Sequence, residues 1–131
     1  MAKKKKIVQV DFEFPIRCSA RLLFQMISTP TGLSDWFAEK VENIGDTFIF
    51  HWGDDTETAE MTDAEDAEFV RYDWIDGDHP GEFFEFNIKV DELTNDVALV
   101  VTDFCEEGEE KSLKLLWETQ VNELMHSIGA A

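Results

Sequence analysis

Alternation of apolar and polar residues recurs along most of the chain and predicts β-strands. The first run places Val8, Val10, Phe12 and Phe14 on one face, and we expect it to end at Pro15. Five further strands are expected at residues 47–52, 58–64, 70–74, 84–90 and 97–104. The strand at 58–64 is weakly patterned, whereas the strand at 97–104 is apolar on both faces, as is typical of a strand covered on both sides.

Two short helices are expected between the first two of these strands. Ser19 is suited to cap a helix that runs through Ile27, because a serine side chain accepts a hydrogen bond from the first helical turn. Thr29 and Pro30 then predict a second start, with Thr29 as the cap and Pro30 in the first helical position. We expect this second helix to deliver three residues to the core: Leu33, Trp36 and Phe37.

The chain closes with a long amphipathic helix, expected from about Glu109 to Ile128 and ended by Gly129. Its apolar residues share one face on a 3.6-residue wheel: Leu113, Leu116, Trp117, Val121, Leu124 and Ile128. Gln120 interrupts that face. A buried amide without a partner costs about 1–3 kcal/mol, so we expect Gln120 to bond either a ligand or a backbone carbonyl or water.

Several segments carry a resemblance to a known family, and together they extend over nearly the whole chain. They are residues 23–37, which contain the run Thr29-Pro30-Thr31-Gly32-Leu33, residues 48–52, 72–74 and 101–104, and Trp117. The sequence resembles the START-like, or SRPBCC, helix-grip superfamily. Within it, the sequence is most similar to homologues of the heat-shock-protein-90 ATPase activator C-terminal domain. The resemblance implies an α+β fold in one domain over residues 1–131, with a curved antiparallel sheet of six to seven strands wrapped around the C-terminal helix.

The resemblance also implies a cavity between the concave face of the sheet and the terminal helix. Large aromatic residues share strand faces there, and such a lining suits a small apolar molecule. The residues expected to line the cavity are Trp36, Phe48, Phe50, Trp52, Tyr72, Trp74, Phe84, Phe86, Trp117, Gln120 and Leu124. Two interpretations stay open, because the same rings either line a cavity or fill the core themselves.

Each of these two interpretations implies a different function. The first expectation is non-enzymatic binding of a small apolar ligand; the alternative is a protein-interaction or co-chaperone-like module without a ligand. A homodimer through outward sheet faces would use Ile49 and Val100. An enzyme ranks last, because the inward strand faces offer almost no acid–base groups and no catalytic motif occurs.

Charge narrows the range of partners. The chain has 29 acidic and 11 basic residues, a net charge of −18. Such a surface repels phosphate backbones and anionic membranes, so neither nucleic acid nor a membrane is an expected partner. The basic residues at 3–6 are followed by an alternating segment rather than a continuous apolar one, and no run approaches the roughly 18 apolar residues of a membrane span. These features favour a cytoplasmic protein.

Cysteine and histidine spacing predicts no metal site and no cofactor. Cys18 and Cys105 lack metal-ligand spacing, and we expect two reduced thiols unless the strands bring them together. His51, His79 and His126 are widely separated, without the paired spacing of a zinc site.

Overall fold

The fold is a mixed α+β arrangement built on one curved antiparallel sheet. A computed structural model describes residues 6–75 and 81–130. Its elements are β1 (Ile7–Ile16), α1 (Ala20–Ser28), α2 (Pro30–Trp36), β2 (Lys40–Ile44), β3 (Thr47–Trp52), β4 (Asp55–Glu65), β5 (Phe69–Trp74), β6 (Phe83–Val90), β7 (Val97–Glu106) and α3 (Glu110–Ser127). The strand order is β1-β7-β6-β5-β4-β3-β2, with every neighbouring pair antiparallel.

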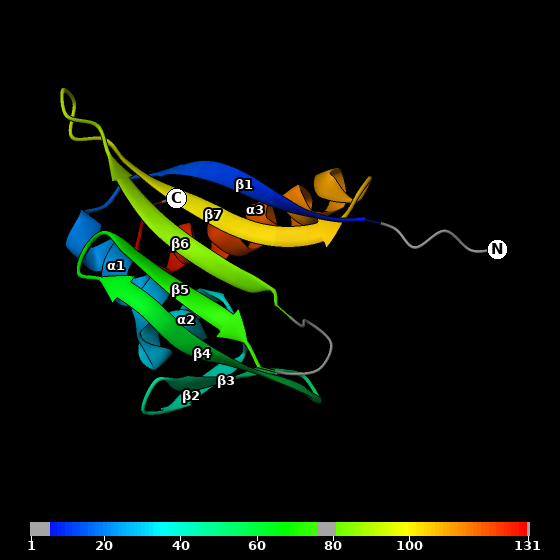
Figure 1. The fold of residues 1–131 in the computed structure, drawn as a ribbon. Helices are drawn as coiled ribbons and strands as arrows, with labels where there is room; N and C mark the ends of the chain where they lie inside the picture. Colours follow the sequence, from blue (N-terminus) through cyan, green and yellow to red (C-terminus); the bar gives the residue numbers. More distant parts are fainter. Residues whose placement is uncertain (1–5, 76–80, 131) are drawn as a thin grey trace.

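All three helices lie on the same side of this sheet (Figure 1). Helix α3 contacts β1, β7 and α2, and α1 contacts β5 and β6. This is the helix-grip arrangement that the resemblance implies, and the seven strands lie within the expected range. The predicted fold class is therefore confirmed.

The first strand is longer than predicted, because Pro15 does not end it. Pro15 pairs with Ala98, and the ladder continues to Ile16 and Val97. Strand β1 forms an edge of the sheet, where one side of the strand has no ladder to interrupt and proline is tolerated. The reading of Pro15 as a strand terminator was therefore wrong.

Strand β2 was not expected from the sequence. It forms the opposite edge of the sheet and pairs with β3. Only Val41 among its five residues is buried. One apolar residue produces no alternation, so the pattern that reveals the other strands is missing here.

Both predicted helix starts are confirmed. The Ser19 side chain accepts a hydrogen bond from the Leu22 amide at 3.1 Å, and Thr29 accepts one from the Gly32 amide at 3.0 Å. Gly32 also sets the approach of the two helices, since a Cβ atom at this position would lie 2.3 Å from the carbonyl oxygen of Gln25. Glycine is therefore required where α2 touches α1.

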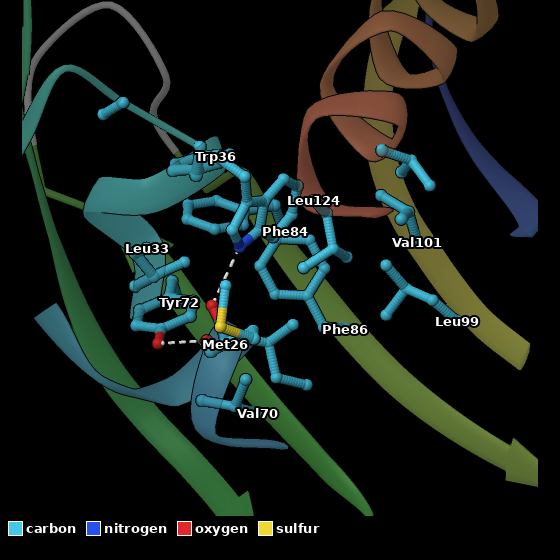
Figure 2. Close-up of a cluster of buried hydrophobic side chains, with 14 of the residues drawn as sticks. Met26, Leu33, Trp36, Val70, Tyr72, Phe84, Phe86, Leu99, Val101 and Leu124 are labelled. Atoms are coloured by element: carbon cyan, nitrogen blue, oxygen red, sulfur yellow. Dashed lines mark hydrogen bonds between the residues drawn. The ribbon is translucent and has the colours of Figure 1, made fainter. Parts of the chain in front are cut away.

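Aromatic and aliphatic side chains fill the space between the sheet and the helices (Figure 2). The polar ends of two of these aromatic residues bond the end of α1. The Tyr72 hydroxyl donates to the Ile27 carbonyl at 2.7 Å, and the Trp36 indole N–H donates to the Met26 carbonyl at 2.9 Å. These two bonds join β5 and α2 to the same turn of α1.

The C-terminal helix presents a narrower buried face than the wheel predicts. Trp117, Val121 and Leu124 are buried, and Leu113 is half-buried. Leu116, however, is 55% exposed and lines an open pocket beside α3. The helix ends as expected, with Ile128 as its C-cap and Gly129 at a positive φ of 72°.

The two cysteines are free thiols, as expected. Cys105 pairs with Val8 near the start of β1, whereas Cys18 follows Ile16 at the other end of that strand. At about 3.3 Å per residue they are roughly 30 Å apart. A disulfide needs Cα atoms within about 7 Å, so none forms between them.

Candidate functional site

A pocket of about 440 Å³ opens between one end of the concave sheet face and the first half of α3. Five strands or their ends contribute to it, together with the residue that follows α2. Its lining residues are Phe37, Trp52, Glu57, Trp74, Glu82, Phe84, Asp103, Phe104, Leu113, Leu116, Trp117 and Gln120.

Phe37 is the central aromatic group of the pocket wall. Its ring stacks on Phe84 and Trp117, with centroid distances of 5.3 and 5.8 Å, and meets the ring of Trp52 edge-on at 5.5 Å. Trp74 extends the wall, 4.9 Å from Phe84. The sequence identified Phe37 only as a core residue, because nothing in a helix-end pattern shows that one edge of its ring borders a pocket.

Hydrogen bonds fix the polar groups of this wall. The Phe37 carbonyl accepts from the Trp52 indole at 3.0 Å and from the Gln120 amide at 3.3 Å. The Trp117 indole donates to Asp103 Oδ2 at 2.9 Å. A backbone carbonyl thus accepts from the Gln120 side-chain amide, as one of the alternatives expected from the sequence. The two indole N–H groups are likewise engaged within the protein.

Three carboxylates line the pocket, and they were not anticipated. Glu57 pairs with the buried Phe50, so both face the concave side. Asp103 lies two positions after Val101, on the same face of β7. The Glu82 carbonyl accepts from the Trp74 amide at 3.1 Å, which places Glu82 beside Trp74. The expectation that inward faces offer almost no acid–base groups is therefore wrong, and continuing the alternation past the last apolar residue of each strand would have found them.

The predicted lining residues divide into two groups along the sheet. Five border the pocket, and Phe84 and Trp117 among them are also buried in the core: Trp52, Trp74, Phe84, Trp117 and Gln120. Six lie in the packed core: Trp36, Phe48, Phe50, Tyr72, Phe86 and Leu124. Of the two interpretations left open by the sequence, core filling describes one end of the sheet and an open pocket the other. Burial at the filled end raises the pKa of the Tyr72 phenol far above its ordinary value.

A second hollow, of about 580 Å³, lies outside this space, at the end of β1 and beside the turn between β6 and β7. Its lining mixes charges of both signs, including Arg17, Lys89 and Asp91. The Lys89 ammonium lies 3.4 Å from Glu13 across it. Its lining is more polar than that of the pocket beside α3, and none of the described residues that line it is aromatic.

Residues 6–75 and 81–130 contain no group of three or more His, Cys, Asp or Glu side chains placed to hold a metal ion. His51 instead lies 3.0 Å from Glu42, while His79 falls outside the described residues. No helix within these two ranges is both long and apolar enough to cross a membrane.

Comparison with known proteins gives the chain its family. A family model described as START-like superfamily domain matches residues 1–130. The solution structure of BfR322 from Bacteroides fragilis is 35% identical, covers 96% of this chain and 93% of its own, and has a TM-score of 0.65. The Aha1 dimer from Colwellia psychrerythraea is 16% identical, covers 92% of both chains and has a TM-score of 0.69.

A third similar fold is that of MLL2253 from Mesorhizobium loti, which is 14% identical, covers 93% of this chain and 97% of its own, and has a TM-score of 0.75. A comparison with curated proteins found no match. The resemblance inferred from residues 23–37 and the later segments is confirmed by the family model and by these folds. The chain therefore belongs to the START-like superfamily.

Proposed function

We propose that this protein binds a small, largely apolar molecule in the pocket between the sheet and α3, without catalysing a reaction on it. The aromatic pocket carries the proposal. Its volume of about 440 Å³ falls within the range of roughly 300–1,000 Å³ that is usual for small-molecule sites.

The fixed wall supports binding in a second way. Because Trp52, Trp117 and Gln120 are already hydrogen-bonded within the protein, the wall needs little rearrangement to receive a ligand. A preformed site loses less conformational freedom on binding, and more of the contact energy appears as affinity.

The test is a fluorescence titration with N-phenyl-1-naphthylamine, a neutral apolar probe whose emission rises in dry surroundings. Leu116 lines the pocket and is 55% exposed, so Leu116→Asp places a charge at the pocket wall without disturbing the core. Leu115, which is 64% exposed and outside the lining, provides the matched control Leu115→Asp.

We expect saturable binding to the wild type and to Leu115→Asp, and binding at least tenfold weaker to Leu116→Asp. Equal loss in both variants, or no saturable binding to the wild type, would contradict the proposal. Circular dichroism of the two variants verifies that both are folded.

A protein-interaction module is the second candidate, favoured by the adjacent exposed leucines 115 and 116 on α3 and by the fold shared with the Aha1 dimer. The alternative homodimer through the outer sheet face involves Ile49 and Val100, both half-buried. These two lie on β3 and β7, with three strands between them. Sedimentation velocity distinguishes the two surfaces, since Leu115→Asp would dissociate a dimer formed through α3 and leave one formed through the sheet intact.

A further inference from the structure

We propose that Gln120 limits the length of the molecule that this pocket accepts, so that the ligand is a compact apolar molecule and not a long chain. The inference rests on the proposed binding function and adds the size of the ligand to it. It starts from a third hollow, of about 280 Å³, which lies beside the pocket. The two share three lining residues, which are Phe37, Trp52 and Gln120.

The pocket and the third hollow follow one another along α3. Leu116 lines only the pocket, Glu123 lines only the third hollow, and Gln120 between them lines both. Side chains three or four positions apart lie on the same side of a helix, so these three residues form one row. A single groove beside α3 thus contains both hollows, and Gln120 lies at the boundary between them.

Hydrogen bonds close the groove at this boundary. The Phe37 carbonyl accepts from the Gln120 side chain at 3.3 Å and from the Trp52 indole at 3.0 Å. Gln120 belongs to α3 and Trp52 to β3, so the two bonds reach one oxygen atom from the two sides of the groove. A ligand that extends along α3 therefore meets the Gln120 side chain, and passing it requires that this bond break and the side chain rotate.

The third hollow offers apolar surface to a longer ligand once this barrier is removed. Its lining includes Trp36 and Ala38, both of which are buried. Replacing Gln120 with alanine leaves the Phe37 carbonyl bonded to the Trp52 indole, so no buried carbonyl loses its last donor. Alanine also favours the helical conformation. The barrier can therefore be removed while the fold is kept.

The experiment measures the affinities of straight-chain alcohols, from pentan-1-ol to dodecan-1-ol, by displacement of N-phenyl-1-naphthylamine from the full chain. These probes are uncharged and differ only in length. Each further methylene that is buried should raise the affinity about fourfold. The stretch of α3 from Leu113 to Gln120 is about 10 Å long. The rise in the wild type should therefore level off near octan-1-ol, whose extended chain has a similar length.

The variant Gln120→Ala should move this limit to longer chains. Its affinities should rise as far as undecan-1-ol, because Glu123 lies about 4.5 Å farther along the helix. Undecan-1-ol should bind the variant at least tenfold more tightly than the wild type, whereas hexan-1-ol should bind both alike. Asn122→Ala is the matched control, because Asn122 is an exposed amide of the same helix outside the described lining of either hollow. Its limit should equal that of the wild type.

The outcomes separate the two proposals. The same limit in Gln120→Ala and the wild type, or a limit that moves equally in Asn122→Ala, overturns the role of Gln120 and leaves apolar binding in place. An unbroken rise through dodecan-1-ol in the wild type, or failure of the alcohols alone to bind, has the same meaning. Failure of the alcohols and of N-phenyl-1-naphthylamine to bind the wild type overturns both proposals.

Discussion

Replacing Tyr72 with phenylalanine removes a single oxygen atom from the centre of the core. The hydroxyl is fully buried and donates to the Ile27 carbonyl at 2.7 Å. This bond joins β5 to the end of α1, between residues 45 positions apart. The substitution leaves the ring and its contacts with Phe48 and Phe84 in place, so its effect isolates the hydrogen bond.

The expected loss of stability is about 2 kcal/mol. A net hydrogen bond contributes about 1 kcal/mol, and leaving the buried carbonyl of Ile27 without this donor raises the cost toward the upper part of the 1–3 kcal/mol range. Unfolding entropy is about 2.1 cal/mol/K per residue, so for the 131 residues of this chain the melting temperature should fall by about 7 °C.

The same hydroxyl makes the difference in stability depend on pH. Burial raises the pKa of Tyr72 far above its ordinary value of about 10. Above pH 10 the unfolded chain ionises this phenol while the folded chain keeps it neutral. The contribution of Tyr72 is therefore fully present below pH 10 and declines above it by about 1.4 kcal/mol per pH unit. The Tyr72→Phe variant lacks this decline.

Urea denaturation of both proteins between pH 8 and pH 11 measures the difference. Because the chain contains one tyrosine, the tyrosinate absorbance near 295 nm reports on Tyr72 alone. We expect that band to appear only as the protein unfolds, and the stabilities of the two proteins to converge above pH 10. Ionisation near pH 10 in folded protein, or equal stability at pH 8, would refute the reasoning.

Three further substitutions test the packing of the helices, each followed by urea denaturation. Gly32→Ala should lower the free energy of unfolding by about 1–3 kcal/mol, because the new methyl group would lie 2.3 Å from the Gln25 carbonyl oxygen. An unchanged urea midpoint would mean that α1 and α2 move apart at no cost in stability. Leu124→Ala, at a fully buried position, should cost about 2–5 kcal/mol, and a loss below 1 kcal/mol would argue against close packing of α3 on the sheet. Ser19→Ala should cost about 1 kcal/mol through the lost bond to the Leu22 amide, a result that Ser19→Asp should reverse.

Much of the fold could be predicted because its elements have strong periodicity. Strand β6 alternates Phe84 and Phe86 with polar neighbours, and both are buried in the structure. The helix caps were equally readable, since Ser19 and Thr29 bond the amides that a cap should bond. Strand β2 was missed because its sole buried side chain is Val41. An edge strand needs little burial, so it leaves little pattern.

The aromatic character of the candidate site could be predicted from the sequence, but its position on the sheet could not. Alternation assigns a residue to a face of the sheet without showing how far along the sheet it lies. Tyr72 and Trp74 share one face of β5, yet Tyr72 is in the packed core and Trp74 borders the pocket. That difference depends on where α3 crosses the sheet, which is a tertiary property. Glu82 and Asp103 were overlooked for a different reason, because the alternation was not followed beyond the last apolar residue of their strands.

The carbonyl of Phe37 has a consequence for how the pocket can change shape. It bonds Trp52 of β3 at 3.0 Å and Gln120 of α3 at 3.3 Å, so a single backbone oxygen ties two opposing walls together. The bond to Gln120 is the longer of the two and comes from a flexible side chain. We therefore expect it to break first when a ligand pushes the two walls apart. Strand β3 is thus the rigid wall of the pocket, and α3 is the wall that can move. We expect bulkier ligands to displace the helix and to leave the sheet in place.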